Sequence, residues 1–220
     1  MSSLKLITID GPSGVGKGTT SRIIAETLGW DYLDSGAIYG VLAFAAQEQG
    51  IDPNAVSTLT ILAQDLPLTF QNAEVYWGTR RVTETIRSEA CGMMASKISA
   101  YPEVRLALLE CQRKFLTPKG LVTDGRDMGT VIFPEAPLKI YLNASPEVRA
   151  KRRFSQLQQA GQHVSFGALL HEIQVRDEQD IHRSASPLKP AQDAILIDTS
   201  ELSIEAVCMK ILSLARSIFS

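Results

Sequence analysis

The chain has 220 residues, of which 45% are hydrophobic and 21% are charged, and its formal net charge is −2. This length suits one domain or a core with an insertion, and the small net charge argues against a broad nucleic-acid-binding surface, which needs a basic excess. No signal-peptide-like or membrane-spanning apolar run is present, and the three cysteines form no C-x-x-C pair. We therefore expect a soluble, cytoplasmic protein with reduced thiols that binds neither membranes nor nucleic acids, and the even spread of charge favours a monomer.

The start of the chain predicts one strand followed by several helices. The short apolar run Leu4–Ile9 predicts a buried strand that ends at Asp10. A helix is expected over residues 16–29, where apolar residues have helical spacing and the last position is a glycine suited to a C-cap. Further helices are expected at about 35–50 and 54–65.

The connection between the first strand and the first helix has the G-x-x-x-x-G-K pattern of a phosphate-binding P-loop. It comprises Gly11, Pro12, Ser13, Gly14, Val15, Gly16, Lys17, Gly18 and Thr19. Glycines let backbone N–H groups converge on phosphates, the helix start adds its positive end, and Lys17 adds a point charge. The strand before it and the helix after it favour a phosphate site over a chance glycine-rich turn. The Ser or Thr that usually follows the lysine and holds magnesium is replaced by Gly18.

The rest of the chain alternates strands and helices around one segment of different texture. Residues 66–85 place aromatic and β-branched residues between turn dipeptides, which predicts two or three short antiparallel strands in an inserted subdomain. Strands are expected at 121–124, 138–142 and 194–198, and helices at about 88–99, 102–116, 145–160, 165–181 and 203–217. This alternation predicts an α/β fold with a mostly parallel sheet and helices on both faces.

A second candidate motif is the apolar run that ends at Asp124 and continues through Gly125 to Arg126 and Asp127. An apolar strand that ends in Asp resembles a Walker B element, whose carboxylate lies near phosphates and magnesium. Asp-Gly is also a common surface turn. The two further charges at the same strand end favour a functional site.

Two predicted helices carry charged residues on one face. Arg149, Arg152 and Arg153 have i, i+3, i+4 spacing, which fits either a solvated basic face or a mobile lid that brings arginines to a transferring phosphate.

Arg176, Asp180 and Arg183 have i, i+4, i+7 spacing on a later helix. They could form a surface ion-pair ladder or hold an anionic substrate that bears a sugar hydroxyl, and the spacing alone does not decide between these.

Together these segments resemble the bacterial cytidylate kinases. The resemblance is carried in chain order by IDGPSGVGKGT, LDSGAIYG, DGRDMGTVIFPEAPLKIYL, RRFSQLQ and VRDEQDIHRSASPL. It implies a P-loop kinase with an inserted monophosphate-binding subdomain and a helical lid. It also implies transfer of the γ-phosphoryl group of Mg-ATP to CMP or dCMP, with Mg²⁺ bound mainly through ATP and no dedicated protein metal site.

The resemblance assigns roles to individual residues. Residues 11–19 would hold the ATP phosphates, and Ser96, Arg105 and Asp127 match positions that recognise cytosine. The catalytic set would be Lys17, Asp124, Arg126, Arg152 and Arg153. The acceptor-binding set would be Ser35, Ser96, Arg105, Arg126, Asp127, Arg176, Asp180 and Arg183.

The resemblance also suggests how the single kinase domain, residues 1–220, is divided. The core would comprise about 1–35, 101–145 and 184–220, the monophosphate-binding insertion about 36–100, and the lid about 146–183.

One position departs from the family pattern. The family has DSGAIYR, with an arginine that contacts the acceptor phosphate, whereas this chain has Gly40. A charge-assisted hydrogen bond contributes about 1.5–3 kcal/mol, so acceptor binding is expected to be weaker or to use another arginine, such as Arg87 or Arg126.

Three alternative functions stay open on the sequence. The nearest is a kinase of UMP, AMP or dTMP, which only base-reading residues separate from a CMP kinase. A small-metabolite kinase of shikimate type would not need the 66–85 insertion. A GTP-dependent switch would be expected to carry N-K-x-D, which this chain lacks.

Overall fold

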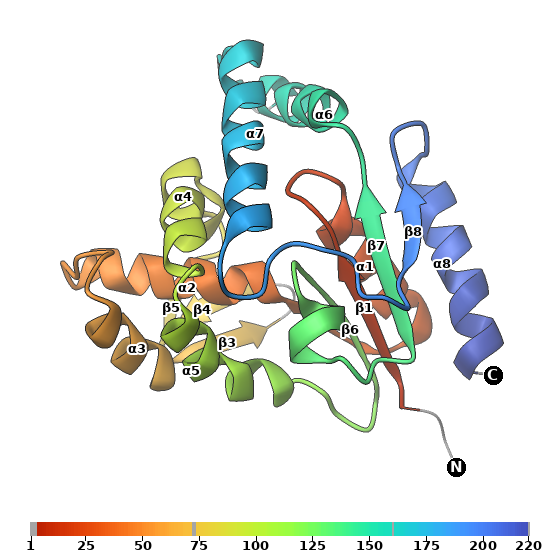
Figure 1. The fold of residues 1–220 in the computed structure, drawn as a ribbon, viewed down its shortest axis with the longest axis horizontal. Helices are drawn as coiled ribbons and strands as arrows, with labels where there is room; N and C mark the ends of the chain where they lie inside the picture. The colour runs from red at the N-terminus through yellow and green to blue at the C-terminus, as the bar shows by residue number, and fades with distance from the viewer. Residues whose placement is uncertain (1–3, 72–73, 160, 220) are drawn as a thin grey trace. The chain divides into compact units, whose positions relative to one another are not determined.

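The computed structural model describes residues 4–71, 74–159 and 161–219. Its contacts divide the chain into two compact units (Figure 1). One unit is built from the segments before Asp34 and after Lys114, and the other is Asp34–Lys114. Each unit is described in turn.

The first unit is organised around a parallel sheet. Among the described residues this sheet has five strands in the order β2-β6-β1-β7-β8. The strands are β1 (Leu6–Asp10), β2 (Asp31–Asp34), β6 (Leu121–Gly125), β7 (Leu138–Asn143) and β8 (Ile195–Asp198). β1 pairs in parallel with β6 and with β7, so Ile9 lies beside both Asp124 and Ile140. Every residue of β1 and β6 is buried, as expected for strands at the centre of a covered parallel sheet.

The helices of this unit are α1 (Lys17–Leu28), α6 (Pro146–Gln159), α7 (Phe166–His182) and α8 (Ile204–Phe219) among the described residues. Of these, α1 and α8 pack on the sheet and enclose its core. α1 contacts β6 and α8, and α8 also contacts β7. Ile24 of α1 and Ile211 of α8 are fully buried in a cluster with the β-strand side chains. α6 and α7 pack against each other, with the rings of Phe154 and Phe166 edge to face and 6.0 Å apart.

The second unit is a helical cluster with a small sheet. Its α2 (Ser35–Glu48) is buried along almost its whole length and contacts α4 (Glu89–Ile98) and the short helix η1 (Thr85–Arg87). α3 (Val56–Gln64) packs against α5 (Pro102–Arg113). Asp34 caps α2, because its carboxylate accepts a hydrogen bond from the Ala37 amide at 3.1 Å. An antiparallel sheet is formed by β3 (Leu68–Gln71), β4 (Glu74–Trp77) and β5 (Arg80–Arg81).

The predicted fold class is confirmed by the parallel sheet with its helices and by the separate antiparallel sheet. Among the described residues, three elements were not predicted, and one of them is the short helix η1. β2 is a four-residue strand with the half-polar sequence DYLD, which has no apolar run to mark it. A π-helical turn, η2 (Met128–Ile132), follows β6. The division into core, insertion and lid at the residues given above stays a prediction.

Gly11, the first P-loop residue, provides a test of how tightly this fold is packed. Its φ is +147°, and a Cβ there would lie 2.1 Å from the Leu142 carbonyl oxygen, a backbone atom of β7 that cannot move aside. Gly11→Ala should lower the free energy of unfolding by several kcal/mol, measured by urea denaturation, since overpacking alone typically costs ~1–3 kcal/mol and backbone strain adds to it.

Gly29→Ala is the matched control for this prediction. Gly29 has φ +67°, and a Cβ added there would meet no atom within 4 Å, so only the left-handed strain of about 1–2 kcal/mol applies. Equal costs at the two positions would contradict the close approach of Gly11 to β7.

Candidate active site

The P-loop joins the end of β1 to the start of α1. Gly14 and Gly16 have positive φ, and the loop turns so that α1 begins at Lys17. The Lys17 side chain is buried, with 6% of the residue exposed, and its ammonium group donates to the Pro12 carbonyl at 2.7 Å. The loop is therefore folded around its own lysine, directly at a helix N-terminus that favours anions.

Burial changes the acid–base behaviour of Lys17. Together with the nearby positive charge of Arg126, it lowers the pKa of the ammonium group to about 7. The carboxylates of Asp124, Asp10 and Asp180 act in the opposite direction. Burial and Arg126 destabilise the charged form of Lys17, and an anion placed beside it would stabilise that form. The site is therefore suited to phosphate.

Asp10, the last residue of β1, is a structural acid in this site that the sequence patterns did not single out. Its two carboxylate oxygens accept hydrogen bonds from the backbone amides of Met128 at 2.9 Å and Gly129 at 2.8 Å. Burial, with a contribution from Asp127, raises the pKa of Asp10 to about 6, although the two amide bonds oppose the shift. Asp10 thus ties the end of β1 to η2. Its position at a strand end immediately before the P-loop is a signal that could have identified it.

The Asp124–Asp127 motif lies at the end of β6, the strand next to β1. Asp124 and Asp127 are both buried, with 6% and 2% of the residue exposed. Asp124 accepts a hydrogen bond from the Tyr32 hydroxyl at 2.8 Å. The predicted alternative of a solvated surface turn is therefore wrong, because these side chains are buried and Asp124 acts on the P-loop lysine.

Arg126 connects this motif to α7. Its Nε donates to the Asp180 carboxylate at 2.7 Å, and only 19% and 6% of the two side chains are exposed. Burial would raise the pKa of Asp180, but the charge and hydrogen bond of Arg126, with Arg183 and Arg176 nearby, hold that pKa below its ordinary value. Burial alone would lower the pKa of Arg126, but the charge and hydrogen bond of Asp180 raise it above its ordinary value.

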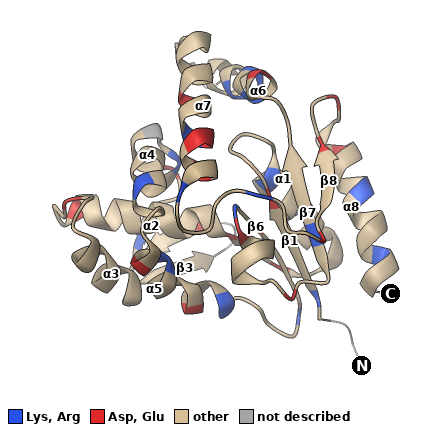
Figure 2. Cartoon of the chain, in the orientation of Figure 1, with Lys and Arg blue, Asp and Glu red and all other residues tan. Residues whose placement is uncertain are grey.

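α7 carries acidic and basic residues together (Figure 2). Asp180 is buried in the ion pair with Arg126, and the Arg183 guanidinium lies 3.8 Å from the same carboxylate. Arg176 contributes to the field at Asp180. The spacing of Arg176, Asp180 and Arg183 fitted either an exposed ion-pair ladder or an anion-binding site. Asp180 is not part of an exposed ladder, because it is buried and acts on the buried charge of Lys17.

The basic face of α6 is not solvated at Arg149. This guanidinium is almost fully buried and donates to the Ser13 carbonyl of the P-loop at 3.0 Å and to the Ala144 carbonyl at 3.0 Å. It also forms a two-point ion pair with Asp177 of α7. Arg149 therefore holds together the P-loop, α6 and α7. Sequence spacing gave no indication of Asp177 as its partner.

The other two arginines of this face have different surroundings. Arg152 donates to the Thr199 hydroxyl at 3.1 Å and to the Thr199 carbonyl. Arg153 is half-buried. Their predicted action on a transferring phosphate stays a prediction.

Comparison with known proteins identifies the family. A family model described as cytidylate kinase matches residues 7–217. A cytidylate kinase from Stutzerimonas stutzeri is 51% identical, with 94% of this chain and 93% of the relative covered. One from Methylococcus capsulatus is 48% identical, with 98% of each covered. The chain belongs to the cytidylate kinase family.

Solved structures agree with this at the level of the fold. A gluconokinase from Sinorhizobium meliloti has a TM-score of 0.50 at 15% identity, covering 99% of this chain and 95% of that one. An uncharacterized protein from Eubacterium ventriosum has a TM-score of 0.54 at 12% identity, covering 98% and 99%. Membership of the cytidylate kinase family decides against the shikimate-type kinase and the GTP switch. In the part of the chain that the structure describes, no helix is long and apolar enough to cross a bilayer.

Several residues that the cytidylate kinase resemblance singled out lie in the Asp34–Lys114 unit. Ser35 is buried, and its hydroxyl donates to the Gln112 side chain at 2.9 Å. Arg105 is also buried, donates to the Ser99 carbonyl at 3.0 Å, and lies over the Tyr39 ring with its guanidinium carbon 5.4 Å from the ring centre.

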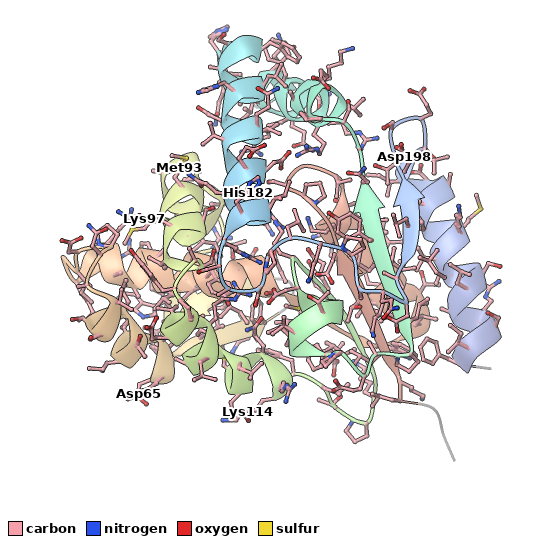
Figure 3. All side chains as sticks on the ribbon, viewed as in Figure 1. Asp65, Met93, Lys97, Lys114, His182 and Asp198 are labelled. Carbon is pink, nitrogen blue, oxygen red and sulfur yellow. The ribbon has the colours of Figure 1, made fainter. Side chains whose placement is uncertain are left out.

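Ser96 is half-buried on α4. The labels of Met93 and Lys97 mark this helix in Figure 3, and the Met93 side chain is exposed. Because Ser96 and Arg105 belong to one unit and Asp127 to the other, their assembly into one cytosine site stays a prediction.

The buried ammonium group of Lys17 predicts a pH dependence of stability. The folded-state pKa is about 7, whereas the ordinary value is 10.5. Between these values the unfolded chain binds a proton that the folded chain has released, so this group makes the free energy of unfolding rise with pH. Relative to Lys17→Met, which has no charge at this position, the wild-type free energy of unfolding should rise by about 1 kcal/mol from pH 7 to pH 8 in urea titrations. Parallel pH profiles for the two proteins would show that Lys17 has an ordinary pKa.

Proposed function

We propose that this chain is an enzyme that transfers the γ-phosphoryl group of ATP to CMP or dCMP, giving CDP or dCDP and ADP. The observation that carries this proposal is the cytidylate kinase family match over residues 7–217. The buried charges around Lys17 support it, because they form a site for a polyphosphate at the junction of the P-loop, the sheet edge and α7.

The chemistry requires alignment and charge neutralisation. The second pKa of a phosphate monoester is about 6, so the acceptor phosphate of CMP is already a nucleophile at neutral pH and no general base is needed. Lys17 and Arg126, with Arg152 and Arg153 after lid closure, would stabilise negative charge in the transition state. Closure would also exclude water and thereby prevent hydrolysis of ATP.

Arg126 is oriented for this role before substrate arrives. Its Nε donates to Asp180, and one terminal nitrogen lies 3.4 Å from the Gly125 carbonyl oxygen. Because a guanidinium has five N–H donors in a fixed plane, these two contacts set its direction and leave donors for a phosphate. This preorganisation means that little reorganisation is required when the phosphoryl group is transferred.

Magnesium is expected to enter with ATP. In the described residues, no group of three or more His, Cys, Asp or Glu side chains is arranged to hold a metal. Asp124, buried at the end of β6, and Thr19, exposed in the first turn of α1, fit a role as partners of the metal's bound waters. When bound, the metal would neutralise charge on the β- and γ-phosphates.

The residues proposed to bind the acceptor are those that the family resemblance assigns. We propose that Ser35, Ser96 and Arg105 act from the Asp34–Lys114 unit. The rest would act from the other unit, namely Arg126, Asp127, Arg176, Asp180 and Arg183.

We also propose that the protein works as a monomer in the cytoplasm. Its three cysteines are Cys91, Cys111 and Cys208, which are free thiols in the structure, and reduced thiols are typical of a reducing compartment.

A panel of acceptors tests the substrate assignment. In a coupled assay for ADP, CMP and dCMP should give the highest kcat/KM, with UMP, AMP and dTMP well below them. The residues proposed to recognise cytosine predict this order, since a hydrogen-bonding site discriminates strongly against bases that leave its groups unpaired. The reaction without an acceptor is the control and should show slow ATP hydrolysis. Equal turnover of UMP, AMP or dTMP would favour the alternative, a kinase of another nucleoside monophosphate.

Gly40 provides a second test, within the Asp34–Lys114 unit. A Cβ at this position would lie 3.1 Å from Ile86 Cβ, so a larger residue requires a small shift of η1. Gly40→Arg should lower the KM for CMP about tenfold, the value of one charge-assisted hydrogen bond, and lower the free energy of unfolding by about 1–3 kcal/mol through overpacking.

Gly40→Ala is the matched control, because it has the same contact with Ile86 but no charge. It should lower stability without lowering the KM. An unchanged or raised KM in Gly40→Arg would show that another arginine already holds the acceptor phosphate.

A further inference from the structure

Tyr32 of β2 bridges two parts of the phosphate site. Its hydroxyl donates to the Asp124 carboxylate at 2.8 Å, although the two residues are 92 positions apart in the chain. Tyr32 is half-buried and Asp124 is buried, so the bond is partly shielded from water. Asp124 in turn acts electrostatically on Lys17 and Arg126. The phenol therefore contacts the carboxylate that faces both buried cations.

The same hydroxyl lies beside Gly18. A Cβ built on Gly18 would be 3.5 Å from the Tyr32 oxygen, which is ordinary van der Waals contact. Position 18 follows the P-loop lysine, and a Ser or Thr there usually supplies a hydroxyl to magnesium. In this chain the hydroxyl that lies beside position 18 is supplied by β2.

The pairing of β2 with β6 does not depend on the hydrogen bond from Tyr32 to Asp124. β2 and β6 are hydrogen-bonded neighbours in the sheet, and the Thr123 hydroxyl additionally donates to the Leu33 carbonyl at 3.1 Å. The Tyr32 bond adds a fixed orientation of one carboxylate. Among the neighbouring acids, Asp10 is tied to the Met128 and Gly129 amides, whereas Asp124 acts on both Lys17 and Arg126.

We propose that Tyr32 is a positioning residue, whose hydroxyl orients Asp124 toward the hydrated magnesium of ATP and takes the place of the loop hydroxyl missing at Gly18. This inference rests on the proposed use of Mg-ATP. It explains how this P-loop can have a glycine directly after its lysine. The Tyr32 hydroxyl near that position comes from β2, a strand that the sheet holds in place.

Tyr32→Phe tests this role, because it removes the hydroxyl and keeps the ring. ATP affinity is measured by calorimetry with Mg²⁺ and, separately, with EDTA. Loss of a charge-assisted hydrogen bond should weaken metal-bound ATP about tenfold, whereas binding of metal-free ATP should change less than about twofold. Tyr76→Phe, on half-buried β4, is the matched control and should leave both affinities unchanged.

A double variant tests the replacement itself. Gly18 has no positive φ, so serine is compatible with its backbone, and the absent phenol oxygen leaves room for the serine hydroxyl. Tyr32→Phe with Gly18→Ser should recover most of the lost affinity for metal-bound ATP. Manganese bound with ATP, observed by electron paramagnetic resonance, should show the same loss and recovery.

Two results would overturn the proposal. One is an equal loss of affinity with and without metal, which would make Tyr32 a general structural tether. The other is no loss in Tyr32→Phe. Wild-type turnover of CMP is measured in parallel: if it fails while Mg-ATP still binds, the proposed function is wrong and the binding comparison still decides the role of Tyr32.

Discussion

The structure depends on the burial of two positive charges at the same place. The charge of Arg126 lowers the pKa of Lys17, and both side chains are largely removed from water. Three carboxylates compensate, and each comes from a different element: Asp10 from β1, Asp124 from β6 and Asp180 from α7. The P-loop, the edge of the sheet and α7 can therefore reach low energy only when they assemble together.

The same constraint explains what the site does. Despite these three carboxylates, burial and the charge of Arg126 keep the pKa of Lys17 lowered, so a further anion beside it would stabilise its charged form. An anion with several charges gains more from such a site than it would from flexible surface lysines, since the charges are already oriented and desolvated. Arg149 extends this arrangement, because its buried pair with Asp177 and its bond to Ser13 fix the P-loop to the helices α6 and α7.

The sequence predicted the parts of this structure that local patterns specify. Apolar runs indicated the central strands, and the glycine spacing indicated the loop at Lys17. It did not predict β2, whose sequence DYLD has no apolar run, nor the η2 turn that Asp10 holds. The site partners were hardest to predict, because Tyr32 with Asp124 and Arg149 with Asp177 are pairs set by tertiary packing. For Arg149, helical spacing identified a shared face but could not say whether that face was solvated.

The most direct test of this charge arrangement is the pKa of Lys17 itself, followed by NMR of its ε-ammonium group with and without ATP. We predict a pKa of about 7 in the free protein. On saturation with Mg-ATP the pKa should rise toward its ordinary value, because the phosphates bring negative charge beside the ammonium group. An ordinary pKa near 10.5 in the free protein, or no change on binding, would contradict the claim that the phosphates bind beside a buried lysine whose charged form is destabilised.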